Sequence, residues 1–180
     1  MGIVDKVISA VTPPESDEAR AEARLKARAA ATPGDWLSMV LDHHLQIESA
    51  FAAVKAATDA ATRRAAQKRL AVILTGHSIA EEAVLYPALA DAGEKGHSGT
   101  AYTEQSAAKV QMALLDEMDP MSQDYVDKFG HLEGAVLHHV YSEEGNWFLD
   151  LKEKVPAAMQ AKLAARYQEE FTRYMGSDAA

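Results

Sequence analysis

The sequence predicts an all-α protein: an antiparallel four-helix bundle with an extra C-terminal helix and an N-terminal helical arm. Long segments carry apolar residues at steps of three and four, which is the period of one helix face. No segment shows the alternation of apolar and polar residues that is typical of a half-buried strand. Four long helices with modest loops between them favour a bundle.

The elements follow in order along the chain. Residues 1–32 are expected to form a partly helical arm, in which DEARAEARLKARAAA is a charged, alanine-rich helix. This helix could lie on the domain surface or bind a partner chain. The bundle is expected over residues 33–155, and an accessory helix and tail over residues 156–180.

The first bundle helix is expected to begin at TPGDW, where Thr32 can cap, Pro33 suits the first helical position and Asp35 supplies negative charge. The other bundle helices are predicted over about 60–91, 100–118 and 122–154. Their inward positions are predicted at Trp36, Val40, His44, Ile47, Phe51, Val54, Leu70, Ile73, His77, Glu81, Val84, Ala88, Tyr102, Gln105, Met112, Leu115, Met118, Phe129, Leu132, Val136, His139, Glu143 and Trp147. The last helix shows Met159, Leu163, Tyr167 and Phe171.

The composition limits the function. A chain of 180 residues with 48% hydrophobic residues suits one domain with a real core. The net charge of −9 argues against nucleic acid and against an anionic membrane surface. The absence of cysteine excludes zinc–thiolate sites, iron–sulfur clusters and thiol nucleophiles. It also fits a cytoplasmic protein, as does a start that is a poor signal peptide.

Several inward positions are polar: His44, His77, Glu81, Gln105, His139 and Glu143. Burying such groups costs several kcal/mol apiece unless they are paired or bind a metal. HSIAEEAVLY (77–86) and HVYSEEGNWF (139–148) share one frame: His, three residues, Glu-Glu, two residues, a bulky apolar residue and an aromatic one. Residues four apart share a helix face, so each frame presents an imidazole and a carboxylate to the bundle axis. Bundles build di-iron sites in this way.

These two stretches, preceded by DHHLQIESAF, resemble the hemerythrin-like HHE cation-binding domain over about residues 33–155. The resemblance implies a non-haem di-iron centre, with two iron ions expected and manganese or zinc as alternatives. It implies the ligands His44, His77, Glu81, His139 and Glu143, with Glu81 and Glu143 bridging. His43 competes with His44 because Asp-His is the usual dipeptide of the family, but the apolar stripe favours His44.

The third helix departs from the family, because Gln105 stands where a histidine would be. Gln105 is expected to form hydrogen bonds near the site, and Glu48, Tyr102, Glu104 or solvent could supply the missing donor. Whether the site holds one metal or two is left open. Tyr86, Trp147 and Phe148 are interpreted as core residues, and Glu82 and Glu144 as solvated or supporting the site from outside.

The leading hypothesis is an iron protein that binds, senses or reduces a small oxidant such as dioxygen, nitric oxide or peroxide. The alternatives are an iron store or sensor without turnover, and a structural or regulatory bundle without metal. Whether the protein is an enzyme is left open. The expected partners are metal ions and the small oxidant, together with a second copy or a helical partner at the arm.

Overall fold

The structure, a computed structural model, describes residues 15–176, so the start of the predicted arm and the end of the predicted tail lie outside it. Within this range every regular element is helical and no strand occurs, which confirms the all-α prediction. The elements are α2 (Asp17–Ala30), α3 (Trp36–Ala56), α4 (Ala60–Ala80), η1 (Glu81–Leu85), α5 (Tyr86–Asp91), α6 (Lys95–Asp116), α7 (Gln123–Ser142), η2 (Glu143–Trp147), α8 (Phe148–Lys154) and α9 (Ala157–Met175).

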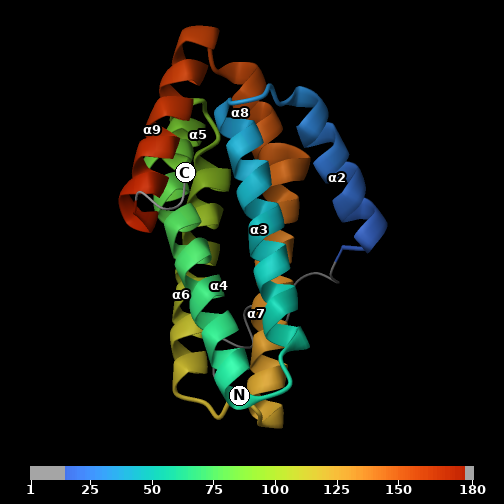
Figure 1. Cartoon of the computed structure of the whole chain (residues 1–180). Helices are drawn as coiled ribbons and strands as arrows, with labels where there is room; N and C mark the ends of the chain where they lie inside the picture. Colours follow the sequence, from blue (N-terminus) through green and yellow to red (C-terminus); the bar gives the residue numbers. More distant parts are fainter. Residues whose placement is uncertain (1–14, 177–180) are drawn as a thin grey trace.

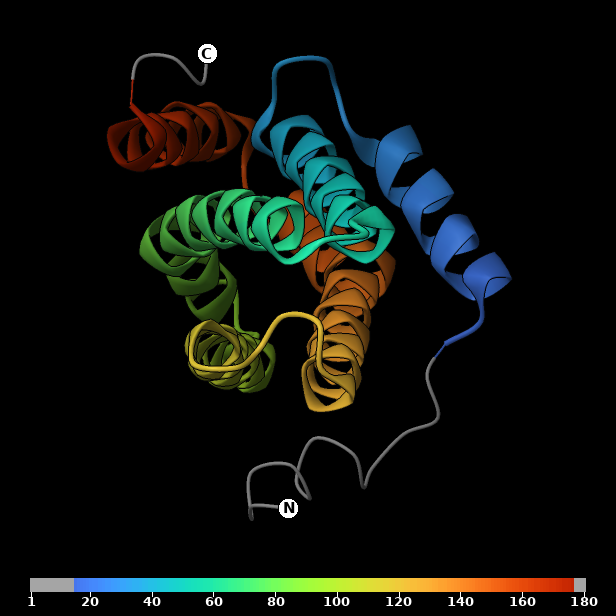
Figure 2. The ribbon, with the colours of Figure 1, turned by 60° about the horizontal axis from the view of Figure 1, so that its bottom comes forward.

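Four antiparallel rods form the bundle (Figure 1). They are α3, the continuous run from α4 through η1 to α5, α6, and the run from α7 through η2 to α8. Figure 2 shows these rods around a common centre, with α2 and α9 outside them. Helix α9 packs on α4, α3 and η1, and α2 packs on η2 and α3. In residues 15–176 we find no helix with the length and apolar character needed to cross a membrane.

The first bundle helix starts later than expected. Asp35, and not Thr32, is its N-cap, because the Asp35 side chain accepts a hydrogen bond of 2.7 Å from the backbone N–H of Ser38. Its other oxygen accepts one of 2.8 Å from the backbone N–H of Thr32. Gly34 has a φ of +82°, so the chain turns there before the helix begins.

The predicted inward positions are largely buried, and they make up most of the core. Two predictions of burial are wrong. Tyr102 is 37% exposed, since its ring lies at the edge of the bundle against Tyr86. Met159 is 45% exposed, whereas Leu163, Tyr167 and Phe171 of the same stripe are buried.

Both predicted frames contain a π-helical turn that begins at the glutamate. The backbone N–H of Tyr86 bonds to the carbonyl of Glu81, and that of Phe148 bonds to the carbonyl of Glu143. Each of these bonds spans five residues, so the turn is wider than an α-helical turn. The widening brings the aromatic residue at the end of each frame back toward the face of its glutamate.

Two glycines lie where the outer helices contact the bundle. A Cβ on Gly76 would lie 2.9 Å from Sδ of Met175 and 3.0 Å from Cδ1 of Tyr174, so these side chains of α9 would have to move. A Cβ on Gly145 would lie 3.5 Å from Cβ of Ala23, which is ordinary contact with α2. Gly76 precedes His77, and Gly145 follows Glu143 and Glu144, so both outer helices pack beside the two frames.

Candidate metal site

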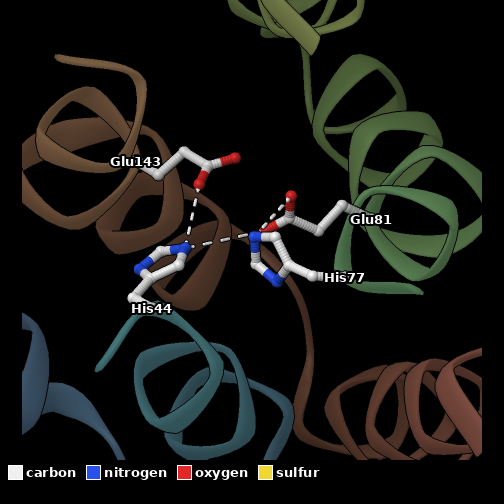
Figure 3. Close-up of side chains that lie close together, drawn as sticks. All are labelled: His44, His77, Glu81 and Glu143. Atoms are coloured by element: carbon white, nitrogen blue, oxygen red, sulfur yellow. Dashed lines mark ion pairs between the residues drawn. The ribbon is translucent and has the colours of Figure 1, made fainter. Parts of the chain in front are cut away.

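Four polar side chains converge inside the bundle (Figure 3). His44 comes from α3, His77 from α4, Glu81 from the start of η1 and Glu143 from the start of η2. Each offers one ligand atom, and these four atoms lie within 4.8 Å of one another. The exposed fraction is 2% for His77 and 0% for the other three. We call these residues the four-donor group.

The four-donor group brings nitrogen and oxygen atoms to short range. Nε2 of His44 lies 3.2 Å from Oε2 of Glu143 and 3.9 Å from Oε1 of Glu81. Nε2 of His77 lies 3.1 Å from Oε2 of Glu81. A cation among these atoms would have two imidazole and two carboxylate ligands, and the two carboxylates would balance a charge of +2.

Three atoms of the four-donor group are buried and have no hydrogen-bond partner among the described residues: His44 Nε2, Glu81 Oε1 and Glu143 Oε2. We call them the open atoms. A buried polar atom without a partner costs roughly 1–3 kcal/mol, so a fold that keeps three together needs a reason. Coordination of a cation supplies that reason, and the residues present therefore fit a metal ion.

The buried histidines are each held through Nδ1, which leaves Nε2 directed inward. The partners are Oε1 of Glu144 for His44 at 2.8 Å, the hydroxyl of Tyr167 for His77 at 3.1 Å, and Oε2 of Glu104 for His139 at 2.8 Å. Partners of this kind fix the ring orientation of metal-binding histidines and make the imidazole a stronger donor.

Helix α2 reaches the site through Arg24. Nε and Nη2 of Arg24 donate to the Glu144 carboxylate over 3.0–3.1 Å. Nη1 and Nη2 also donate to Glu48 over 2.9 and 2.6 Å. The guanidinium thus neutralises a carboxylate that is only 1% exposed and that holds His44.

His139 lies outside the four-donor group. Its Nε2 is 3.0 Å from the Tyr86 hydroxyl and 3.2 Å from Oε1 of Glu143. The Tyr86 oxygen also lies 2.9 Å from Oε1 of Glu143 and 3.1 Å from Oε2 of Glu81, and its single O–H can donate to one of them at a time. Nε2 of Gln105 donates to Oε2 of Glu81 over 2.6 Å and to the Tyr86 oxygen over 2.5 Å. Its Oε1 is buried without a hydrogen-bond partner in the described part of the chain.

The buried groups of the site shift one another's pKa values. Burial alone would lower the pKa of His44, but the carboxylates of Glu143 and Glu144 raise it to about 9. Burial and the neighbouring charge of Glu143 raise the pKa of Glu81 to about 8. Burial opposes the charge of Glu143, yet His139 and His44 hold the pKa of Glu143 well below its usual range. Burial and the charge of His44 lower the pKa of His77.

The alternative donors considered from the sequence lie outside the four-donor group. Nδ1 of His43 is 2.8 Å from the Tyr167 hydroxyl, and its ring stacks on Phe171 with centroids 3.8 Å apart. Glu48 pairs with Arg24, as described above. The Tyr102 hydroxyl donates to the backbone carbonyl of Glu82 over 2.6 Å.

The sequence did not predict the roles of three residues that contact the site: Arg24, Tyr86 and Tyr167. The charged helix offered no sign of which arginine turns inward, and both tyrosines occupy positions that an apolar ring would fill equally well. One signal was available for Tyr86. It ends the first frame with a hydroxyl, whereas Phe148 ends the second frame with a bare ring.

A second acidic group among the described residues, Glu94, His97 and Asp150, is half-exposed. Lys154 forms ion pairs with both carboxylates of that group, so an ammonium already neutralises them. The buried four-donor group is therefore the candidate metal site.

Comparison with known families decides the relationship. The model of the hemerythrin HHE cation-binding domain matches residues 36–151. The chain belongs to this family. The resemblance seen in the sequence is thus confirmed, and the buried histidine–glutamate group of this HHE domain is compatible with metal binding.

Among curated proteins, a DNA nickase of Nostoc sp. (strain PCC 7120 / SAG 25.82 / UTEX 2576) is 27% identical over 95 residues. The alignment covers 53% of this HHE chain but only 27% of that protein. The name of the relative therefore describes a much longer chain. No solved structure matches significantly.

Proposed function

We propose that this HHE protein binds iron at the four-donor group and that the iron binds, senses or reduces a small oxidant such as dioxygen, nitric oxide or peroxide. The observation that carries the proposal is the set of open atoms at His44, Glu81 and Glu143, all 0% exposed. No hydrogen bond within the described residues satisfies these atoms. Nε2 of His44 lies 3.2 Å from Oε2 of Glu143, so these two form an ion pair while His44 is protonated, and a cation that displaces the proton would bind both.

The donor chemistry supports iron. Two imidazoles with two carboxylates suit non-haem Fe(II), although manganese and zinc accept similar ligands. Four protein donors leave about two of roughly six positions for a small molecule. When bound, Fe(II) supplies an electron and a position at which an oxidant can coordinate.

The residues around the donors favour a small ligand. The burial of all four donors leaves no room for a bulky substrate to reach them without movement of the helices. Glu144 and Tyr167 hold the two donor imidazoles in fixed orientations. The surrounding core, with Ile47 and Phe51 following His44 along α3, limits the access of water.

The test uses protein purified without a histidine tag. We expect elemental analysis after anaerobic loading with Fe(II) to find iron in the wild type and almost none in His44→Ala. We also expect the near-ultraviolet absorption of the loaded protein to change on addition of dioxygen, nitric oxide or peroxide. Iron content near zero in the wild type would contradict the proposal, provided that circular dichroism shows a folded protein.

A second candidate function is a sensor of metal occupancy without turnover. The path from Arg24 through Glu144 to His44 favours it, because it connects the outer helix α2 to a donor. In that case hydrogen exchange in α2 should slow when metal binds, while the loaded protein consumes no oxidant. Equal exchange in α2 with and without metal would speak against a sensor.

A further inference from the structure

In each carboxylate of the four-donor group, Glu81 and Glu143, the two oxygens have different surroundings. Oε1 of Glu81 and Oε2 of Glu143 are open atoms, 3.9 and 3.2 Å from Nε2 of His44. Oε2 of Glu81 and Oε1 of Glu143 instead lie 3.1 and 2.9 Å from the hydroxyl of Tyr86. One oxygen of each carboxylate has no hydrogen-bond partner among the described residues, whereas the other lies within hydrogen-bond distance of the Tyr86 hydroxyl. Oε2 of Glu81 is also 3.1 Å from Nε2 of His77.

A second cation bridged by the same carboxylates would need the side that Tyr86 serves. It would share Oε2 of Glu81 and Oε1 of Glu143, and the imidazole outside the four-donor group that lies beside them is His139, 3.2 Å from Oε1 of Glu143. All three of these atoms lie within 2.9–3.1 Å of the Tyr86 hydroxyl. The hydroxyl therefore stands among the donors that a second ion would use.

Gln105 completes the arrangement. It turns its amide nitrogen, and not its oxygen, toward Glu81 and Tyr86. An amide N–H₂ group donates hydrogen bonds but does not coordinate a cation. Oε2 of Glu81 thus faces the Gln105 amide and the Tyr86 hydroxyl, and these two groups occupy the positions around it that a metal would take.

The aromatic residues that end the two frames differ in one group, because Tyr86 has a hydroxyl and Phe148 does not. Glu81 is followed five residues later by Tyr86, and Glu143 by Phe148. Both aromatic residues are 0% exposed, and both directly follow a π-helical turn. Phe148 packs edge-to-face on Trp36, with ring centroids 5.5 Å apart, and brings no polar atom to the site.

We propose that the site holds a single metal ion, at His44, His77, Glu81 and Glu143, and that Tyr86 and Gln105 occupy the place of a second. This inference rests on the metal binding proposed above. It narrows the chemistry, since one Fe(II) gives one electron on oxidation to Fe(III). The two-electron reduction of dioxygen to hydrogen peroxide would then require a second chain or an external reductant.

The experiment counts metal ions per chain. The full-length protein is stripped with chelator, loaded anaerobically with excess Fe(II) or Mn(II), desalted and subjected to elemental analysis. We expect one metal per chain in the wild type and two in Tyr86→Phe/Gln105→His, which removes the hydroxyl and adds an imidazole. Tyr125→Phe is the matched control, because Tyr125 is 1% exposed and its hydroxyl bonds to Gln67 instead. It should stay at one.

A second measurement needs no variant. Mn(II) in the wild type should give the electron paramagnetic resonance signal of an isolated ion, without the spin coupling of a carboxylate-bridged pair. This readout decides the metal count even if the double variant does not fold.

Two metals per wild-type chain, or a coupled manganese signal, would overturn the inference while leaving the proposed function standing. A visible tyrosinate-to-Fe(III) band together with two irons would mean that Tyr86 is a ligand of the second ion. A folded double variant that still holds one metal would show that Tyr86 and Gln105 are not what prevents a second metal ion from binding. No metal in any protein would overturn the proposed function as well.

Discussion

The carboxylate of Glu144 lies 2.8 Å from Nδ1 of His44 and is itself only 1% exposed. Arg24 donates to both of its oxygens from α2. A donor imidazole of the candidate site is thus oriented by a buried ion pair that begins outside the bundle. The outer helix contributes to the site as well as to the packing.

Replacing Glu144 with glutamine should weaken metal binding. The amide keeps the shape of the side chain but removes the charge that orients His44 and leaves Arg24 short of an anion. Loss of such a supporting carboxylate lowers metal affinity by about 10- to 100-fold. Competition titration of the metal-free protein with Mn(II) or Zn(II) against a chromophoric chelator measures this change.

Glu82→Gln is the matched control, because Glu82 holds the corresponding position in the other frame. It pairs with Lys109 on α6 and contacts no donor histidine among the described residues. Its affinity should stay within about twofold of the wild type. Equal losses in both variants would mean that charge near the site, and not the orientation of His44, sets the affinity.

Tyr167→Phe should weaken binding through His77. The substitution removes the hydroxyl that lies 3.1 Å from Nδ1 of His77 and keeps the ring, which is fully buried. Loss of one neutral hydrogen bond costs about 1 kcal/mol, so we expect roughly fivefold lower affinity. Tyr174→Phe, an exposed change on the same helix, should have no effect in the same titration.

Metal binding should release protons. In the metal-free protein the pKa of His44 is raised to about 9 and that of Glu81 to about 8, so both groups hold a proton at pH 7. A cation needs both atoms deprotonated, and it therefore displaces close to two protons at pH 7 and fewer above pH 9. Calorimetry in buffers of different ionisation enthalpy measures this number. An affinity that is constant from pH 6 to 9 would contradict the assignment.

The same pKa shifts give the metal-free protein a pH-dependent stability. Both folded pKa values lie above the unfolded ones, so the stabilising contribution is full at low pH. It is lost as pH rises through about 8 for Glu81 and about 9 for His44. We expect the melting temperature of metal-free protein to fall between pH 6 and 9, and the gain on metal binding to grow.

Bound metal should raise thermal stability. At a free metal concentration 100 times Kd, the gain is about 2.7 kcal/mol. For a chain of this size, that gain corresponds to roughly 5–11 °C in Tm. His77→Ala should lose most of this shift, whereas His131→Ala, an exposed histidine, should retain it. Differential scanning calorimetry with and without chelator is the measurement. A full shift in His77→Ala would place the binding elsewhere.

The helices were predictable because apolar residues repeat along them without interruption. The second rod was expected over about residues 60–91, and the structure has helix from Ala60 to Asp91. The π-helical turns within the rods were not predictable in the same way. One extra residue in a turn moves the apolar stripe by one position, so Leu89, and not the predicted Ala88, is fully buried. Apolar residues stand at both positions, so the periodicity across Glu81 looks continuous in the sequence.

The convergence of His44, His77, Glu81 and Glu143 follows from their places on inward stripes of separate helices. The roles of Tyr86 and Arg24 do not, because both depend on tertiary contacts. Tyr86 points its hydroxyl at Glu81 only once the π-helical turn has widened the helix. Arg24 meets a glutamate 120 residues away, and it is one of five arginine or lysine residues between residues 1 and 30 that look equally suitable from the sequence alone.

The complete burial of the four donors also governs how fast a metal ion can come and go. Every donor is at most 2% exposed, so a cation enters or leaves only when helices of the bundle separate. The rate of that opening then limits how fast the ion can exchange, in addition to the strength of its coordination bonds. Protein that acquires its metal while folding would keep it through dialysis, whereas folded metal-free protein would fill slowly.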